Sequence, residues 1–352
     1  MRIIQAILFS SVVCVVSAAP PNGQGYALKW SDEFDSTTLD TNNWSFDTTW
    51  GMWLDANFKY YTNGLNLTFE NGSAVLWAKK ERYKGFDYTS CFMNTQGKKE
   101  FMYGYMEAKI KTPHGRGLWP AFWMLGSNYN TAGWPVCGEI DLYEQRTGPQ
   151  LYNGTPGDNC FNATCFFNGA SGLPSYNAKQ FNDTECLCND YHLYAIEWDS
   201  LGIKYFFDGT LFWEYDTINA SSNVATFHQP FYIIANIDIG ANYGGLPIDT
   251  AIFPQRMYID YVRVYQKSTP AISSQQKHTI PDGALLYSSH ANLNLYDLQG
   301  RFVGDFSNLF RLVKYDEGLF VNAVKSRVPQ GVYLARISMG RHIVNERLVV
   351  KK

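Results

Sequence analysis

The sequence predicts an all-β protein: a β-sandwich or jelly roll followed by a small C-terminal β segment. Apolar and polar residues alternate with period two in many short segments, helical periodicity is nearly absent, and Gly- and Asn-rich turns separate the segments. Many antiparallel strands joined by tight turns are typical of two sheets packed face to face. The 352 residues, 45% of them hydrophobic, suffice for one large core and a smaller appendage.

Residues 1–19 have the pattern of a secretory signal peptide. Arg2 precedes an apolar run from Ile3 to Val16, and the small residues at 17–19 follow. An N-terminal membrane anchor is the alternative, but it needs a longer apolar run. We therefore expect residues 1–19 to be removed and the protein to be secreted, without association with a membrane.

Residues 20–266 contain the strand-like segments of the main domain. From Tyr103 to Lys111, the apolar residues Met106, Ala108 and Ile110 occupy alternate positions, as in a half-buried strand. A hairpin is indicated at residues 208–209, because Asp-Gly tolerates the positive φ of a tight turn. Further strands are expected at Ile203–Phe207, Thr210–Tyr215, Phe231–Ile239 and Met257–Tyr265.

The composition changes after the last of these strands. Residues 267–284 are mostly polar and indicate a linker, and residues 285–352 predict a second, small β domain. Its clearest strands begin at Gly331 and Leu348, with a turn near Met339 between them.

Six cysteines remain beyond the signal peptide: Cys91, Cys137, Cys160, Cys165, Cys186 and Cys188. Export permits disulfides, and bridges within residues 160–188 would staple a long Gly/Asn-rich loop. A zinc site is the alternative, but the cluster contains no histidine and its spacings do not match a zinc finger or ribbon. The pairing stays open at this point.

The charge distribution limits the class of partner. The formal net charge is −3 and both signs are interspersed, so the sequence offers no basic surface for nucleic acid and no polybasic run for anionic lipid. A neutral partner is therefore expected.

The segment Gly138–Glu144 carries the candidate chemistry. Side chains alternate along a strand, so Glu139 and Asp141 share one face while Glu144 should point to the other. A β-bulge with one extra residue, at Leu142 or Tyr143, would bring Glu144 back to the same face. Three carboxyls would then line one groove.

Three neighbouring acids on one sheet face are costly, because mutual repulsion and partial desolvation disfavour their ionised forms. A retaining glycosidase needs such a cluster, with two carboxyls about 5–5.5 Å apart, one ionised to attack and one protonated to release the leaving group. A solvated acidic face and a calcium site are the alternatives. The tryptophans Trp119 and Trp123, just upstream and an even number of steps apart, favour the catalytic interpretation because aromatic rings cover the C–H faces of sugars.

The chain from Trp30 to Tyr265 resembles glycoside hydrolase family 16, in particular its laminarinase-like members. The segments that carry the resemblance are Ser31–Phe34, Tyr103–Lys111, Gly117–Gly126, Trp134–Asp141, Tyr194–Trp198 and Met257–Tyr265. The resemblance implies a concanavalin-like jelly roll with an open cleft and endo-acting hydrolysis of β-1,3- or mixed β-1,3-1,4-glucan with retention. We expect a monomer that needs no cofactor for catalysis.

The resemblance also implies roles for individual residues. Glu139 matches the nucleophile, Asp141 its assisting acid and Glu144 the acid/base. Trp119 and Trp123 match residues that pack on sugars, and Asn236 matches a polar position on the inner face of the cleft. Many members bind a structural Ca²⁺ through residues that match Glu33, Gly72 and Asp260.

Two departures from the family pattern leave the substrate open. No histidine follows the acidic motif in the segment from Gln150 to Thr155, and the insertion that contains Cys160 to Cys188 is longer than usual. The alternatives are a hydrolase of another β-linked polysaccharide, of the agarose or carrageenan type, and a non-catalytic glucan-binding module. The C-terminal segment resembles, more weakly, the sorting domains of bacterial type IX secretion.

Overall fold

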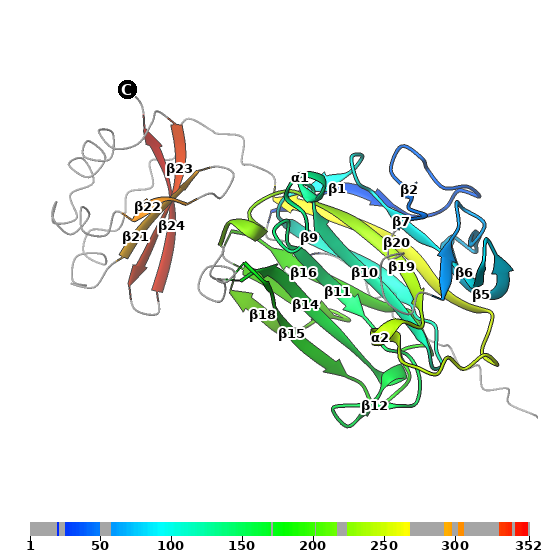
Figure 1. The fold of residues 1–352 in the computed structure, drawn as a ribbon. Coiled ribbons are helices and arrows are strands. Elements are labelled where there is room, and N and C mark those ends of the chain that lie inside the picture. The colour runs from blue at the N-terminus through cyan, green and yellow to red at the C-terminus, as the bar shows by residue number, and fades with distance from the viewer. Residues whose placement is uncertain are drawn as a thin grey trace, which may run out of the picture.

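Figure 1 shows the computed structural model of the chain as a ribbon. It describes residues 20, 25–49, 58–169, 172–200, 202–216 and 224–267, together with the backbone of the strands at 292–297, 302–305, 331–339 and 342–350. The predicted signal peptide and residues 268–284 of the predicted linker lie outside the described residues. Among the helices of the described part, none is long and apolar enough to cross a membrane.

The main domain is a jelly-roll sandwich of two antiparallel sheets, as the sequence predicts (Figure 1). The ten-stranded sheet has the order β18 (Thr210–Asp216), β17 (Gly202–Phe207), β16 (His192–Trp198), β9 (Gly104–Lys111), β20 (Gln255–Lys267), β5 (Ser73–Tyr83), β6 (Phe86–Ser90) and β3 (Lys59–Tyr61), with β1 (Tyr26–Asp32) paired to β20 and β4 (Leu67–Glu70) to β5. Only β3 and β6 run parallel among these pairs.

The eight-stranded sheet carries the candidate site. Its order is β15 (Pro174–Asn182), β14 (Cys160–Asn168), β11 (Glu139–Glu144), β10 (Leu118–Gly126), β19 (Phe231–Ile239), β7 (Phe92–Asn94) and β2 (Ser45–Phe46), with β8 (Glu100–Phe101) paired to β19. The short elements are α1 (Tyr129–Ala132), β12 (Leu151–Tyr152), β13 (Thr155–Pro156), η2 (Gly157–Asn159), η3 (Val224–Phe227) and α2 (Ala241–Gly244).

One hydrophobic core fills the space between the two sheets. Met106, Ala108 and Ile110 of β9 are buried in it, as predicted. On the other face Lys109 and Lys111 are half-buried, but Tyr105 and Glu107 are buried, so the predicted half-buried strand is confirmed only in its second half. The eight-stranded sheet contributes the opposite wall with residues such as Phe122, Met124, Ile140, Tyr143 and Ile233. Burying each large apolar side chain stabilises the fold by about 1.5–3 kcal/mol.

The predicted hairpin at residues 208–209 joins β17 and β18. Asp208 has a φ of 46° and Gly209 a φ of 76°, so both adopt the left-handed conformation that a two-residue turn requires. The carboxylate of Asp208 accepts a hydrogen bond from the backbone N–H of Leu193 at 2.7 Å. The turn is thereby tied to the neighbouring strand β16.

The C-terminal segment contains a separate four-stranded sheet with the order β22 (Phe302–Asp305), β21 (Asn292–Asp297), β23 (Gly331–Met339) and β24 (His342–Val350). The strands predicted from Gly331 and Leu348 correspond to β23 and the end of β24. Whether this sheet is a sorting domain stays a prediction.

The expectation that disulfides close the long loop at residues 160–188 is wrong. The bridge in the described part joins Cys186 to Cys188, which are two residues apart and close no long loop. Cys160 and Cys165 lie on β14 as free, buried thiols. The insertion instead forms the paired strands β14 and β15, so backbone hydrogen bonds replace the expected staples.

Candidate active site

A β-bulge on β11 brings the three predicted acids to one face. Phe122 of β10 pairs with Tyr143, whereas the next residue, Trp123, pairs with Asp141, so Leu142 is the extra residue. On the other side of β11, Asp141 pairs with Thr164 and Glu144 with Asn162, so three steps along β11 correspond to two steps along β14. The predicted bulge is confirmed, and the parity change places Glu139, Asp141 and Glu144 on the face of the sheet that points away from the main core.

Core packing explains why the bulge is held in place. Tyr143 is fully buried, its ring lies 4.6 Å from that of Tyr194 across the sandwich, and its hydroxyl donates to Gln145 at 2.6 Å. The side chain of Gln145 in turn donates to the carbonyl of Gly157. With Ile140 also in the core, β11 cannot shift its register without exposing apolar side chains.

Each outer carboxylate of the cluster accepts a hydrogen bond from an indole. The Nε1–H of Trp134 donates to Glu139 at 2.7 Å, and the Nε1–H of Trp119 donates to Glu144 at 3.0 Å. Asp141 lies between the two glutamates, is 1% exposed, and neither of its oxygens has a protein donor. Because Asp141 is within hydrogen-bonding reach of both glutamates, a proton on it would satisfy one of these contacts.

The carboxyls of this cluster have raised pKa values. Burial, followed by the charge of Glu144, raises the pKa of Asp141 well above its usual range. Burial likewise raises the pKa of Glu144 to about 7, opposed by the Trp119 hydrogen bond and by the charge of Arg146. Burial and Glu144 raise the pKa of Glu139, while Trp134 and Asp141 donate to it and act in the opposite direction. The cluster therefore retains protons near neutral pH.

The predicted sugar-contacting residues lie beside the acids on β10 and β19. Trp119 is half-buried and its ring packs on Tyr243, with centroids 4.7 Å apart. Trp123 is 7% exposed and its Nε1–H donates to Asn236 at 2.8 Å. All three predicted residues thus share the face of the carboxyl cluster, and Trp119 is the more accessible of the two tryptophans.

Five residues of the site lie outside the sequence predictions. Lys59 of β3 is 1% exposed and its ammonium lies 2.7 Å from Asp238 of β19, which also accepts a hydrogen bond from Tyr61. Trp134 donates to Glu139 at one end of β11, and Arg146 follows the other end, where its charge acts on Glu144. Lys59 stands between the aromatic residues Phe58 and Tyr60, and this position was the sequence signal that could have indicated the buried ion pair.

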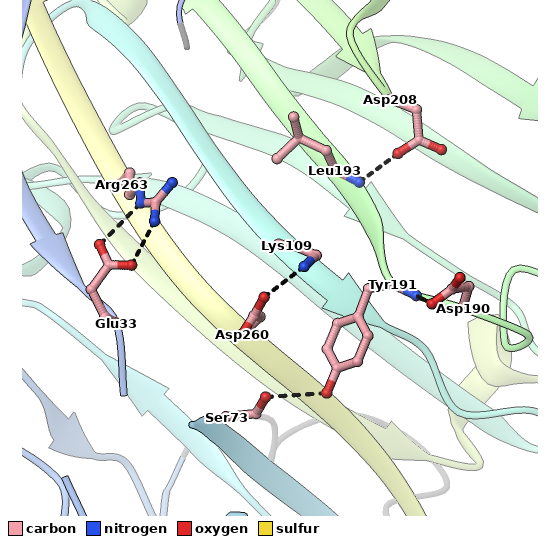
Figure 2. A network of polar contacts seen from close by, with 9 residues as sticks. All are labelled: Glu33, Ser73, Lys109, Asp190, Tyr191, Leu193, Asp208, Asp260 and Arg263. Atoms are coloured by element: carbon pink, nitrogen blue, oxygen red, sulfur yellow. Dashed lines mark hydrogen bonds and ion pairs between the residues drawn. The ribbon is translucent and has the colours of Figure 1, made fainter. Parts of the chain in front are cut away.

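Glu33 and Asp260, two of the three residues expected to hold Ca²⁺, lie on the ten-stranded sheet and its edge (Figure 2). Both oxygens of Glu33 accept hydrogen bonds from Arg263, and Asp260 accepts one from Lys109 at 2.8 Å. Gly72 lies in the turn between β4 and β5 with a φ of 76°. Within the described residues, no three His, Cys, Asp or Glu side chains gather as a metal site. Since protein cations already neutralise both carboxylates, this arrangement does not fit a calcium ion.

The sequence and the fold were compared with known proteins. The family model for glycosyl hydrolases family 16 matches residues 42–263. The chain is 34% identical to a beta-glucanase of Rhodothermus marinus, over 68% of this chain and 85% of the relative. It is 35% identical to the clotting factor G alpha subunit of Tachypleus tridentatus, over 77% of this chain but only 38% of that relative. A solved structure, the laminarinase from Flavobacterium sp. UMI-01, superposes with a TM-score of 0.60 at 40% identity, over 68% of this chain and 100% of the other.

Proposed function

The chain belongs to glycosyl hydrolase family 16, and on that premise we propose that it is a retaining endo-β-glucanase of β-1,3- or mixed β-1,3-1,4-glucan. The observation that carries the proposal is the bulge at Leu142, which places Glu139 and Glu144 on one face with Asp141 between them. Retaining hydrolysis needs two carboxyls close enough to act on one glycosidic bond.

In the first step, the carboxylate of Glu139 attacks the anomeric carbon and the bond to the glycosidic oxygen breaks. Glu144 gives its proton to that oxygen, and a glycosyl ester of Glu139 remains. A raised pKa keeps Glu144 protonated near neutral pH, which the acid role requires. Burial and the charge of Glu144 raise the pKa of Glu139 to about 8, and the hydrogen bonds from Trp134 and Asp141 act in the opposite direction, toward the ionised form that the nucleophile role requires.

In the second step, water replaces the leaving group. Glu144, now ionised, takes a proton from the water as the water oxygen attacks the anomeric carbon, and the ester bond to Glu139 breaks. Two inversions at the same carbon give net retention. Trp119 donates to Glu144 throughout the cycle and fixes its orientation.

The substrate class follows from the relatives and from the charge of the site. The Rhodothermus and Flavobacterium relatives are named for glucans. The three carboxyls of the cluster disfavour sulfate or carboxylate groups on the substrate wherever they are ionised, and the cation that acts on Glu144 is Arg146. A neutral glucan therefore fits this face better than a sulfated galactan does.

A reducing-sugar assay on laminarin, lichenan, agarose and carrageenan, run side by side, tests the proposal. We expect release from laminarin, lichenan or both, in internal fragments that appear before glucose. Cleavage of agarose or carrageenan alone would assign the site to another polysaccharide, and binding of glucan without any release would assign the chain to the non-catalytic class.

We also propose that the mature protein is a secreted monomer. The pattern of residues 1–19 supports export, and the four-stranded sheet formed by β21 to β24 is compatible with a C-terminal sorting domain. Mass spectrometry of the exported protein tests the removal of residues 1–19, and size-exclusion chromatography with light scattering tests the monomer. An intact N-terminus would contradict the signal peptide, and the mass of a dimer would contradict the monomer.

A further inference from the structure

A buried ion pair lies on the same face of the eight-stranded sheet as the carboxyl cluster. The ammonium of Lys59, on β3, is 2.7 Å from a carboxylate oxygen of Asp238, on β19, and the two side chains are 1% and 6% exposed. Asp238 points to the same side as Asn236, two residues earlier on the strand, and its other oxygen accepts from the backbone N–H of Ile239 at 2.7 Å. A sugar cannot reach either charged group, and the catalytic steps above make no use of them.

Stability alone does not account for this ion pair. Two buried charges lose their hydration, and their attraction does little more than offset that loss, so apolar residues of similar volume are often at least as stable. The best-attested use of such a pair is to select one arrangement of the polar groups around it. The ammonium of Lys59 also lies 4.7 Å from the ring centroid of Tyr61, whose hydroxyl contacts the same carboxylate. Tyr61 is therefore the neighbour on which the pair acts.

A chain of hydrogen bonds connects the ion pair to a tryptophan beside the carboxyl cluster. The hydroxyl of Tyr61 donates at 3.2 Å to the oxygen of Asp238 that also accepts from Lys59. The amide nitrogen of Asn236 donates to the Tyr61 oxygen at 3.3 Å. The amide oxygen of Asn236 accepts from the Nε1–H of Trp123 at 2.8 Å. Three links thus separate the carboxylate from the indole.

The chain has a single possible direction. An ionised carboxylate only accepts, so the Tyr61 hydroxyl donates to it. Burial, followed by the charge of Asp238, raises the pKa of Tyr61 well above its usual range and keeps the proton on this hydroxyl. The Tyr61 oxygen then accepts from the amide nitrogen of Asn236, which turns the amide oxygen toward Trp123, whose indole can only donate. The charge at one end therefore fixes the orientation of the amide near the other end.

The chain opens toward the surface at its Trp123 end. Asn236 and Trp123 are 6% and 7% exposed, against 1% for Lys59. An amide has two N–H donors and two lone pairs, and within the described residues the chain uses one of each, which leaves one of each for a sugar hydroxyl. The ring of Phe92 meets the rings of Tyr61 and Trp123 edge-on, at centroid distances of 5.4 and 6.3 Å, and supports both beside the chain.

From this geometry we propose that Lys59 and Asp238 are positioning residues for substrate binding. Through Tyr61 they hold the amide of Asn236 and the indole of Trp123 in a single orientation, without touching the sugar themselves. The inference rests on the proposed function and on the sugar-contacting role predicted for Asn236 and Trp123. Because the chain ends at Trp123, the ion pair should affect the binding of the glucan and not the chemical steps.

Initial rates of laminarin hydrolysis by the full-length chain test the proposal. We expect K59M/D238L to raise KM about tenfold, the effect of losing a fixed hydrogen bond to the sugar, and to keep kcat within about threefold of the wild type. This double variant leaves no buried charge unpaired, so its Tm should stay near the wild-type value. K109M/D260L is the matched control, because Lys109 and Asp260 form an ion pair of 2.8 Å on the ten-stranded sheet. Its KM should stay at the wild-type value.

Y61F breaks the chain in the middle and leaves the ion pair in place. It should raise KM as K59M/D238L does, and adding it to K59M/D238L should raise KM no further, because both changes break the same chain. The indole N–H signal of Trp123 in the NMR spectrum, assigned with Trp123→Phe, gives a readout that does not depend on activity. In Y61F and in K59M/D238L this signal should move upfield and exchange faster with water, and in K109M/D260L it should not change.

Several results would overturn the inference. A wild-type KM with an unshifted indole signal in K59M/D238L is one, and a fall of kcat with KM unchanged is another. If K59M/D238L fails to fold, Y61F decides the matter alone, and a wild-type KM in Y61F would then refute the positioning role. A wild-type chain that cleaves no glucan would instead overturn the proposed function, while the indole signal would still test whether the ion pair positions Trp123.

Discussion

The outer faces of the two sheets both carry acidic side chains, but the carboxylates are paired with cations on one face and cluster with one another on the other. On the ten-stranded sheet, Glu33 is paired with Arg263 and Asp260 with Lys109 (Figure 2). On the eight-stranded sheet, three carboxyls lie together and receive hydrogen bonds from two indole N–H groups, from Thr164 and from one another. The pKa of Glu33 is lowered by its hydrogen bonds to Arg263, whereas the pKa values of the cluster are raised by burial.

Glu107 shows that a raised pKa by itself does not distinguish a catalytic carboxyl. Glu107 of β9 is fully buried on the ten-stranded sheet, and burial raises its pKa to about 7. It accepts a long hydrogen bond of 3.4 Å from Tyr265, and the carboxylate whose charge acts on it, Glu33, is paired with Arg263. A raised pKa alone is therefore no sign of a site. The sign is the gathering of several unpaired acids next to half-buried aromatic rings.

The largest expected effect is on activity, where a substitution on the eight-stranded sheet is compared with one on the ten-stranded sheet. Glu139→Ala should lower glucan hydrolysis by about 10⁴-fold or more, because the nucleophile is lost, while Asp260→Asn should stay within about twofold of the wild type. Initial rates on laminarin measure both. Added azide should restore cleavage of an aryl glycoside by Glu139→Ala and give the product of inverted configuration. Residual hydrolysis of Glu139→Ala within tenfold of the wild type would remove Glu139 from its role.

A second prediction concerns the acid/base. Glu144→Ala should lose about 10²–10⁴-fold in activity on polymer, but much less on an aryl glycoside with a good leaving group, which needs little protonation. Comparing kcat/KM on the two substrates measures the difference. Equal losses would argue against the acid role of Glu144.

The pH dependence provides a third prediction. Since the folded-state pKa of Glu144 is about 7, its proton is present below that pH and lost above it. The kcat/KM for laminarin should fall about tenfold per pH unit above about 7, and the basic limb should disappear for an activated aryl glycoside in Glu144→Ala. A profile that stays flat to pH 9 would contradict the assignment.

A fourth prediction concerns thermal stability: neutralising a clustered carboxyl of the eight-stranded sheet should raise Tm, and neutralising a paired carboxyl of the ten-stranded sheet should lower it. The folded pKa of Asp141 is raised, so folding at pH 8 requires a buried charge or proton uptake, and Asp141→Asn should raise Tm by about 2–4 °C, which corresponds to about 1 kcal/mol. Glu33 has a lowered pKa and an exposed ion pair, so Glu33→Gln should lower Tm slightly at pH 8 and have no effect at low pH.

Glu107→Gln is the matched control for Asp141→Asn. Both substitutions remove a buried carboxyl of raised pKa, so both should raise Tm at pH 8, but only Asp141→Asn should reduce activity, by about 10–100-fold. Thermal melts and initial rates on the same preparations decide the matter. Loss of activity in Glu107→Gln, or full activity in Asp141→Asn, would break the distinction between the two faces.

The smallest expected effect concerns metal. Because Arg263 and Lys109 already neutralise Glu33 and Asp260, adding Ca²⁺ or a chelator should shift Tm by less than about 1 °C. A clear rise of Tm with Ca²⁺ concentration would show that a calcium ion binds after all.

The sequence predicted those features that depend on neighbours along the chain. The alternation of residues 103–111 predicted β9, and the chemical need for Glu139 and Glu144 on one face predicted the bulge that the strand pairing contains. Asp260 shows the limit of this approach. It lies at an irregularity of β20 opposite β9, and its partner Lys109 could be recognised only once these two strands were paired.

The parts of the site that were missed come from long-range contacts. Arg146 is held by Tyr243, which follows it by almost a hundred residues, and Lys59 pairs with Asp238 on a strand much later in the chain. Such contacts depend on sheet order, which local patterns do not encode. Trp134 is closer to Glu139, but their contact depends on the turn between them, so spacing alone did not reveal it.

The central claim is that the bulge on β11 puts two carboxyls on one side of a single glycosidic bond. Proton NMR of the first products from a reduced oligosaccharide or from lichenan, recorded before mutarotation, tests it most directly. Double displacement by Glu139 and Glu144 predicts that the β-anomer forms first and converts slowly to the equilibrium mixture. First appearance of the α-anomer would mean single displacement by water and would contradict the account.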